Sequence, residues 1–502
     1  MSKPYYLSTA ISYPNGAPHV GHAYEAIAAD VMARFQRGQG RDVYFQTGTD
    51  EHGLKMAQTA REQGITPGEL GAKMSSMFKA MCDDLGITYD RFIRTNDEDH
   101  HRAAQALWKA LEANGDLYLG RYEGWYSVRD EAFYDEKELT TGEGGEKLSP
   151  EGTPVEWQVE ETWFFRLSAY QQKLLDHIAA NPDFIAPKSR RNEVVSFIEG
   201  GLKDLSVSRT SFDWGVPVPG SEGHVMYVWL DALTNYITGV GYPDGGKRWD
   251  KFWPADCHLI GKDIIRFHAV YWPAFLMSAG IELPGQVFAH GFLLGEGGVK
   301  MSKSLGNVVD PMEMARRHGV DALRYYLLRE VSFGQDGSVG EESLVTRVNA
   351  ELANSFGNLA QRTLSMIHKN LDGLIPAAGV DGADVALLEK VREACEEQLP
   401  SHFEHWAFEK GVEAWLQAVY ACNAYVDEMA PWALRKTDPE RMAAVLGTLA
   451  AAIKPLAEAI QPVVPAGAQA VLDQLAAGEG GAPIAKPTPA FPRLELVTEE
   501  GA

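Results

Sequence analysis

A chain of 502 residues exceeds what one hydrophobic core usually holds, so two to four domains are expected. Its 45% hydrophobic and 23% charged residues are typical of a globular protein, and the absence of an apolar run after Met1-Ser2-Lys3-Pro4 argues against a signal peptide. The net charge of −23 argues against binding nucleic acid over the whole surface, so an RNA partner would have to meet local groups of Lys and Arg.

Cysteines and apolar runs indicate a cytoplasmic protein. The longest apolar region, 443–464, is interrupted by Lys454 and Pro455, which favours a packed helix over a membrane span. The cysteines are scattered, which suits a reducing compartment and argues against disulfides or a cysteine-rich zinc site. They are Cys82, Cys257, Cys395 and Cys422. We therefore expect no membrane contact.

The first predicted elements are a strand at 5–10 and a helix at 23–37, joined by a tight turn. Pro14, Gly16 and Pro18 prevent regular structure in that turn. His19 and His22 fall where the helix begins, and a helix N-terminus with added imidazole N–H groups suits a triphosphate. Taken alone, the two histidines also fit ordinary surface residues or half of a metal site.

A second strand is predicted at 43–47. It ends in 48–53, which contains Asp50, and a helix follows. Strands that alternate with helices predict a doubly wound parallel sheet, in which ligands bind beyond the carboxyl ends of the strands. The acidic and histidine run at 96–101 fits a capped helix start better than a metal cluster.

From 116 to 225 the pattern changes to short aromatic and polar runs between glycine-rich turns, which predicts a small inserted domain. The sheet pattern resumes with 227–232, then 257–260 ending in Gly261-Lys262-Asp263, and then 286–290. A glycine-flanked basic loop at 300–304 follows, and by itself it would be a solvated loop. Apolar spacing in 344–368, 402–429 and 440–459 predicts a helical bundle.

His19-Val20-Gly21-His22 together with Lys300-Met301-Ser302-Lys303-Ser304 resembles the two signatures of class I aminoacyl-tRNA synthetases, and the surrounding residues resemble methionyl-tRNA synthetase over 5–493. The resemblance implies an α/β fold: a Rossmann-like doubly wound parallel sheet split by a connective insert and followed by an α-helical anticodon-binding bundle. The expected parts are the first half of the catalytic domain (1–115), the insert (116–225), the second half of the catalytic domain (226–285), the lysine-signature loop and linker (286–340), the anticodon-binding bundle (341–480) and a tail (481–502).

The resemblance also implies the reaction: ATP activates methionine to methionyl-adenylate, pyrophosphate leaves, and the aminoacyl group passes to the 3′-terminal ribose of tRNA(Met), initiator and elongator. The expected catalytic residues are His19, His22, Lys300 and Lys303. The expected ATP-binding residues are Gly21, Gly261, Asp263, Lys300, Met301, Ser302, Lys303 and Ser304. Mg²⁺ is expected to accompany ATP, held mainly by phosphate oxygens and water.

Two further residue sets follow from the resemblance. The expected methionine-binding residues are Ile11, Tyr13, Asp50, Trp229, Ala232, Tyr236, Ile264, Phe267 and His268, although spacing alone would suit ordinary core aromatics. The expected anticodon-binding residues are Asn358, Arg362 and Trp432, although a helix-surface pair and a core tryptophan would give the same pattern. Asn358 and Arg362 are four residues apart and so share a helix face.

The insert departs from the family pattern, which often has a zinc knuckle with Cys-x-x-Cys pairs. Ser127-Val128-Arg129-Asp130 and Ser149-Pro150-Glu151 stand in those places, so we expect no zinc. A C-terminal dimerisation module is not recognised, so we expect a monomer. The competing interpretations are a class I synthetase for cysteine or a branched aliphatic amino acid, a small-molecule nucleotidyltransferase, and a catalytically idle RNA-binding relative.

Overall fold

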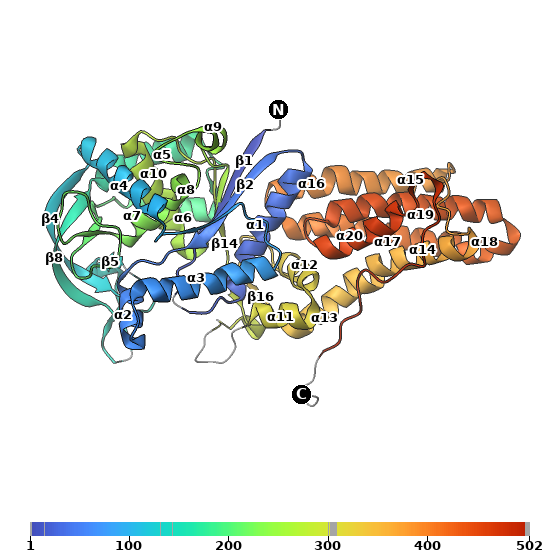
Figure 1. Ribbon diagram of the computed structural model, residues 1–502, viewed down its shortest axis with the longest axis horizontal. Helices are drawn as coiled ribbons and strands as arrows, with labels where there is room; N and C mark the ends of the chain where they lie inside the picture. The colour runs from blue at the N-terminus through green and yellow to red at the C-terminus, as the bar shows by residue number, and fades with distance from the viewer. Residues whose placement is uncertain are drawn as a thin grey trace. The chain divides into compact units, whose positions relative to one another are not determined.

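The computed structural model describes residues 3–14, 16–130, 132–142, 144–299, 301 and 309–496. Contacts within the chain define two units. Figure 1 shows the ribbon coloured by residue number. The first unit comprises Met1–Pro18 and Gln36–His290, and the second comprises His19–Phe35 and Gly291–Ala502. Most of helix α1, Val20–Gly38, therefore belongs to the second unit although strands of the first unit flank it in sequence.

A six-stranded parallel sheet forms the centre of the first unit (Figure 1), in the order β3-β2-β1-β13-β14-β9. Its strands are β1 Pro4–Thr9, β2 Asp42–Thr49, β3 Arg91–Arg94, β9 Ile185–Ala186, β13 Cys257–Gly261 and β14 Val287–His290. On one side β1 pairs with β2, with Pro4 opposite Asp42, and on the other with β13, with Leu7 opposite Cys257. The strand order therefore proceeds outwards from β1 towards both edges of the sheet. Open α/β sheets bind ligands at such a switch point.

The strands are apolar because parallel sheets are covered on both faces. Leu7, Phe45 and Leu259 have no exposed surface. The helices of this unit are α2 Leu54–Gln63, α3 Pro67–Asp84, α4 Glu98–Ala113, α5 Gln171–Ala180, α6 Lys188–Glu199, α7 Val228–Leu233, α8 Asn235–Thr238, α9 Lys247–Phe252 and α10 Trp272–Ala279. The predicted fold class, a doubly wound parallel sheet followed by a helical domain, is confirmed.

An antiparallel sheet follows α4. Its two long strands, β4 Leu117–Ser127 and β8 Glu156–Phe165, pair with each other. The short strand β5 Ala132–Tyr134 pairs with β4, and β10 Leu205–Ser206 pairs with β8. The short pairs are β6 Thr140–Thr141 with β7 Lys147–Leu148, and β11 Ser208–Arg209 with β12 Val225–Met226. Strand β9 lies inside the predicted insert range yet pairs with β14 of the main sheet. The predicted domain boundaries stay predictions.

A hydroxyl–carboxylate cluster occupies the positions where the resemblance places zinc ligands. Asp130 Oδ2 accepts hydrogen bonds from Ser149 Oγ and Thr153 Oγ1, both at 2.6 Å, and from Tyr134 OH at 3.1 Å. Thr153 Oγ1 also lies 2.6 Å from Ser127 Oγ. The two serines and the threonine are buried. Hydrogen bonds therefore join the two loops, while the absence of zinc stays a prediction.

The second unit is mainly helical. Its helices, besides α1, are α11 Pro311–His318, α12 Val320–Glu330, α13 Glu341–Val348, α14 Asn358–Asn370, α15 Gly382–Arg392, α16 Leu399–Glu404, α17 Phe408–Met429, α18 Pro431–Thr437, α19 Pro439–Ile460 and α20 Pro465–Ala476. A π-helical segment, Asn349–Gly357, joins α13 to α14, and β15 Leu293–Leu294 pairs with β16 Gly337–Ser338. Helix α19 is long and apolar enough to cross a membrane, but 61% of its apolar window is buried by the unit, as in a core helix.

A buried ion pair fixes α1 within this unit. Arg324 of α12 donates to Asp30 Oδ2 at 2.6 Å and to the carbonyl oxygens of Pro462 and Val463 at 2.9 and 3.0 Å. Arg34 donates to the same Asp30 oxygen at 2.7 Å. Arg324 and Asp30 are fully buried, so loss of either would leave an uncompensated charge.

The hydroxyl–carboxylate cluster predicts metal-independent stability of the insert. Asp130→Ala should lower the free energy of unfolding by about 1–3 kcal/mol, because the buried Ser149 and Thr153 hydroxyls and the partly buried Tyr134 hydroxyl lose their acceptor. Incubation with a chelator should leave the urea unfolding curve of the unsubstituted protein unchanged. Metal analysis that finds about one zinc per chain would contradict this interpretation.

Candidate functional site

The signature turn places two imidazoles side by side at the start of α1. The rings of His19 and His22 have centroids 3.8 Å apart. His22 Nδ1 accepts the backbone N–H of His19, and His19 Nδ1 accepts the backbone N–H of Gly21, both at 3.1 Å. A Cβ atom on Gly21 would lie 3.0 Å from the His19 ring, so glycine keeps this packing open.

These hydrogen bonds decide where each ring keeps its proton. Burial and the neighbouring His19 lower the pKa of His22 to about 3, so the ring is neutral near pH 7. Because Nδ1 of each ring accepts a backbone N–H, the proton of a neutral ring stays on Nε2. His19 and His22 thus carry N–H donors at a helix N-terminus, the chemistry that suits phosphate oxygens.

The lysine signature lies largely outside the described residues. Lys300, Ser302, Lys303 and Ser304 fall there, and Met301 is the described member of the motif. The glycine-rich approach to it is described: the Gly295 N–H donates to the Val299 carbonyl at 2.8 Å. The sequence prediction for the four residues therefore stays a prediction.

Four of the residues expected to bind methionine form two aromatic pairs between the segments 228–238 and 267–271 of the first unit. Trp229 of α7 stacks on Phe267 with centroids 3.7 Å apart and planes 7° apart. His268 Nε2 lies 2.7 Å from the Tyr236 hydroxyl, and His268 Nδ1 lies 3.0 Å from the Ile264 carbonyl. Phe267 and His268 lie in a π-helical turn, Phe267–Tyr271, a distortion frequent at functional sites.

The tautomer of His268 follows from these contacts. Because a carbonyl can only accept, Nδ1 donates to Ile264 and Nε2 accepts the Tyr236 proton. Burial lowers the pKa of His268 to about 4, so the ring is neutral near pH 7. A neutral, hydrogen-bonded aromatic wall suits a polarizable thioether.

Asp50 follows directly after β2 and is buried. Its Oδ1 atom accepts the His52 backbone N–H at 3.3 Å and the Thr95 hydroxyl at 3.4 Å. Tyr13 lies in the segment after β1, and its hydroxyl accepts the Met56 N–H at 3.0 Å. Ile11 precedes Ser12, which bridges to Thr49 of β2. A carboxylate at the end of a central strand suits an ammonium ligand.

Gly261 and Asp263 lie where β13 ends. A Cβ atom on Gly261 would stand 2.6 Å from Asp263 Oδ1, so a larger residue would displace this carboxylate. Ala232 is buried in α7, one turn from Trp229. The structure therefore gathers the expected methionine residues and the Gly261–Asp263 pair on elements of the first unit, and places the histidines in the second.

The three expected anticodon residues lie in the helical unit. Asn358 begins α14, and Arg362 lies one turn later. The Arg362 guanidinium lies 5.6 Å from the ring centroid of Trp432, whose side chain is 52% exposed, and 3.9 Å from Asp427. An exposed tryptophan beside an arginine can stack with an unpaired base.

Sequence reasoning missed a group of buried polar residues beside the predicted ones. Glu51 and His52 follow Asp50, and Asp231 lies between Trp229 and Ala232. His100, in the segment read as a helix start, is hydrogen-bonded to Asp231. Asp97 does stand immediately before α4, as that interpretation predicted. The signal that could have identified Glu51, His52 and Asp231 is that each lies within two residues of Asp50 or Trp229 in the sequence.

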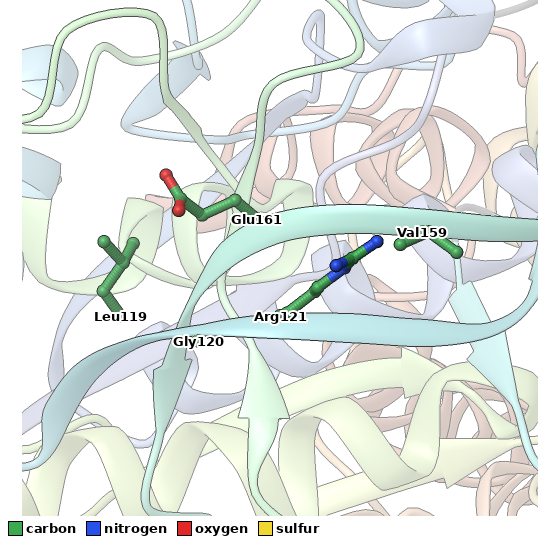
Figure 2. Close-up of a pocket in the computed structure, with 5 residues that line it drawn as sticks. All are labelled: Leu119, Gly120, Arg121, Val159 and Glu161. Atoms are coloured by element: carbon green, nitrogen blue, oxygen red, sulfur yellow. The ribbon is translucent and has the colours of Figure 1, made fainter.

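A hollow on the antiparallel sheet lies apart from these residues in sequence. Figure 2 shows Leu119 and Arg121 on β4 and Val159 and Glu161 on β8 around it. It contains none of the expected site residues. Among the residues that the structure describes, no three His, Cys, Asp or Glu side chains are grouped as metal ligands.

Comparison with known proteins agrees with this arrangement. Residues 5–364 match the family described as "tRNA synthetases class I (M)", and residues 375–488 match "Anticodon binding domain of methionyl tRNA ligase". Fold, signature turn and both matches define the class: a class I aminoacyl-tRNA synthetase.

Relatives give the particular family. Methionine–tRNA ligase of Brucella suis is 55% identical over 512 residues, covering 99% of each chain, and that of Mycobacterium bovis is 54% identical over 513 residues, covering 98% of each. The structure of Mycobacterium tuberculosis methionyl-tRNA synthetase in complex with methionyl-adenylate superposes with a TM-score of 0.94 at 54% identity, covering 98% of this chain and all of that one. The chain belongs to the methionyl-tRNA synthetase family.

The buried His268 predicts a loss of stability in mild acid. Its folded pKa of about 4 lies below the value of about 6.5 for an unfolded histidine, so in that interval the unfolded chain binds a proton that the folded chain does not. This contribution is complete above pH ~6.5 and is lost as the pH falls towards 4.

His268→Gln should therefore weaken the pH dependence. Between pH ~7.5 and ~5, the free energy of unfolding should fall by about 2 kcal/mol less in His268→Gln than in the unsubstituted protein. Urea unfolding followed by tryptophan fluorescence at both pH values measures the difference. Equal falls in the two proteins would show that His268 does not titrate as its burial implies.

Proposed function

We propose that the chain ligates methionine to tRNA(Met) in two steps, using ATP. The observation that carries the proposal lies in the first unit, which holds the buried Asp50 carboxylate after β2 together with the Trp229–Phe267 and Tyr236–His268 ring pairs. A carboxylate for the ammonium group and polarizable aromatic rings for the thioether are the two features that a methionine site requires.

Each group of residues has its own task in selecting the amino acid. Asp50 holds the ammonium group, Trp229 and Phe267 pack along the side chain, and His268 stays neutral opposite it. Ile11, Tyr13, Ala232, Tyr236 and Ile264 complete the pocket. An apolar pocket discriminates one methylene by only about 1–3 kcal/mol, so homocysteine is the competitor that this site rejects least well.

The first step forms the adenylate. A carboxylate oxygen of methionine attacks the α-phosphorus of ATP, the bond to pyrophosphate breaks, and charge spreads over phosphate oxygens. The step needs positioned donors rather than a covalent enzyme nucleophile. We assign this task to the Nε2–H groups of His19 and His22 and to Lys300 and Lys303, with Gly21, Met301, Ser302 and Ser304 as further contacts to ATP.

The nucleoside part of ATP is assigned to Gly261 and Asp263, with Asp263 accepting from the ribose hydroxyls. The triphosphate would carry Mg²⁺, because phosphate oxygens and water are ligands that suit this ion. The ion adds positive charge at the phosphates. We also propose that the protein is a cytoplasmic monomer without resident zinc.

In the second step a hydroxyl of the 3′-terminal ribose of tRNA(Met) attacks the acyl carbon of the adenylate, the bond to the phosphate breaks, and AMP leaves. Asn358, Arg362 and Trp432 are assigned to the anticodon, which the initiator and elongator tRNAs share. The support is the exposed Trp432 ring with the Arg362 guanidinium 5.6 Å from its centroid. The large helical unit also disfavours a nucleotidyltransferase that acts on small molecules alone, which would not need it.

Exchange of labelled pyrophosphate into ATP tests the first step. It should require methionine and should not occur with cysteine, leucine or isoleucine. His22→Asn should lower the exchange rate about 10²–10³-fold, because one donor to the developing phosphate charge is lost. Exchange with another amino acid would overturn the pocket assignment, and no exchange with any of them, even with tRNA, would favour the idle relative.

Trp432→Ala tests the second unit. The KM for tRNA(Met) in aminoacylation should rise about tenfold or more through lost base stacking, while pyrophosphate exchange stays unchanged. Trp157→Ala is the matched control, because Trp157 is 53% exposed on β8 of the other unit. Equal KM values for the two variants would remove Trp432 from the anticodon site.

A further inference from the structure

Three consecutive side chains after β2 are each held in place. Asp50 accepts from Thr95 and from the His52 backbone N–H. Glu51 receives two hydrogen bonds from Arg94, at 2.5 and 2.9 Å, and one from Ser75 at 2.5 Å. His52 contacts the side chain of Asp231. The loop that carries Asp50 is therefore held by contacts of Asp50 itself and of the two residues that follow it.

The His52 contact belongs to a buried triad. His52 Nδ1 lies 2.6 Å from Asp231 Oδ2, and His100 Nε2 lies 2.7 Å from Asp231 Oδ1. His52 is 2% exposed, and Asp231 and His100 are fully buried. Burial alone would raise the pKa of Asp231, but the two histidines outweigh it and hold the pKa well below its usual range.

The triad joins two segments to which methionine-binding residues are assigned above. Asp231 lies in α7 between Trp229 and Ala232, and His52 follows Asp50 by two residues. One hydrogen bond thus connects the loop of the ammonium ligand to the helix of the side-chain wall, across 179 residues of sequence. Apolar residues often replace a buried ionic group without loss of stability, so stability alone gives no reason for a charge here. The need for a fixed distance between the two segments gives a reason for the buried charge.

We propose that Asp231 is a positioning residue for methionine: with His52 and His100 it sets the separation between the Asp50 carboxylate and the Trp229–Ala232 wall. This inference rests on the proposed function. Asp231 acts through Asp50 and Trp229 rather than on the substrate. The fixed separation favours an amino acid whose thioether lies as far from its ammonium group as it does in methionine.

Asp231→Asn tests the proposal. Asparagine has nearly the same size but keeps one acceptor oxygen, so one histidine contact is lost. The KM for methionine in pyrophosphate exchange should rise about 10–100-fold, as for a misplacement of about 1 Å, while the KM for ATP changes less than about twofold. Titration of the purified protein with methionine alone should show the same loss of affinity.

Asp116→Asn is the matched control. Asp116 Oδ2 accepts hydrogen bonds from Tyr170 at 2.5 Å, Ser278 at 2.6 Å and Asn114 at 2.7 Å, in the same unit but outside the predicted site. This variant should lower the melting temperature and leave the KM for methionine unchanged. If Asp231→Asn behaves in the same way, its role is structural and the proposal is overturned.

A second pair of variants keeps the test valid if Asp231→Asn does not fold. His100→Gln retains an N–H donor for Asp231, whereas His100→Ala removes it. The KM for methionine should rise in His100→Ala and be restored at least in part in His100→Gln. Equal KM values in both would overturn the proposal. If the unsubstituted protein shows no methionine-dependent exchange, the proposed function fails; if it does and these variants match it, the positioning role alone fails.

Discussion

The pairing of β1 with β13 is the contact on which the geometry of the first unit depends. It brings together segments about 250 residues apart, and side chains reinforce it: the Tyr6 N–H donates to Asp256 at 2.8 Å, and Ser8 Oγ lies 2.7 Å from His258 Nδ1. The Tyr6 hydroxyl also donates to the Tyr236 carbonyl at 2.8 Å. Through these contacts Asp50, after β2, and Gly261, at the end of β13, come to the same edge of one sheet.

Buried and partly buried carboxylates make further connections. In the turn between β4 and β5, the partly buried Asp130 accepts from three hydroxyl donors and joins that turn to the loop that carries Ser149 and Thr153. In the helical unit, Arg324 joins α12 to Asp30 of α1. Beside the pocket, Asp231 joins α7 to the loop after β2. The buried Asp30 and Asp231 carboxylates each have more than one donor, which is the condition under which a buried charge can be kept. These contacts fix positions that apolar packing alone would leave adjustable.

The sequence predicted elements with strong local patterns and missed those that depend on distant partners. The position of Asp50 after a buried strand could be predicted from the apolar run before it, and the start of α4 could be predicted because acidic residues favour that position. The partner of His100 could not, since Asp231 lies 131 residues away and no local pattern links them. Strand β9 has two residues, too few for any periodicity, so its place beside β14 was missed. The sequence shows that Ser127 and Asp130 stand where the family pattern has cysteines. Their hydrogen bonds with Thr153 could not be predicted from the sequence.

The β1–β13 pairing can form only after the ribosome has made β13, long after it has made β1. At about 5–20 residues per second, the ribosome takes roughly 12–50 s to make the ~250 residues that separate the two strands. Throughout that interval one edge of β1, with the apolar Tyr5, Tyr6 and Leu7, has no strand to pair with, and unpaired edges promote aggregation. Strands β4 and β8, paired antiparallel within that interval, are complete before β13 emerges. The β4–β8 pair can therefore form in the nascent chain while the parallel sheet still lacks β13.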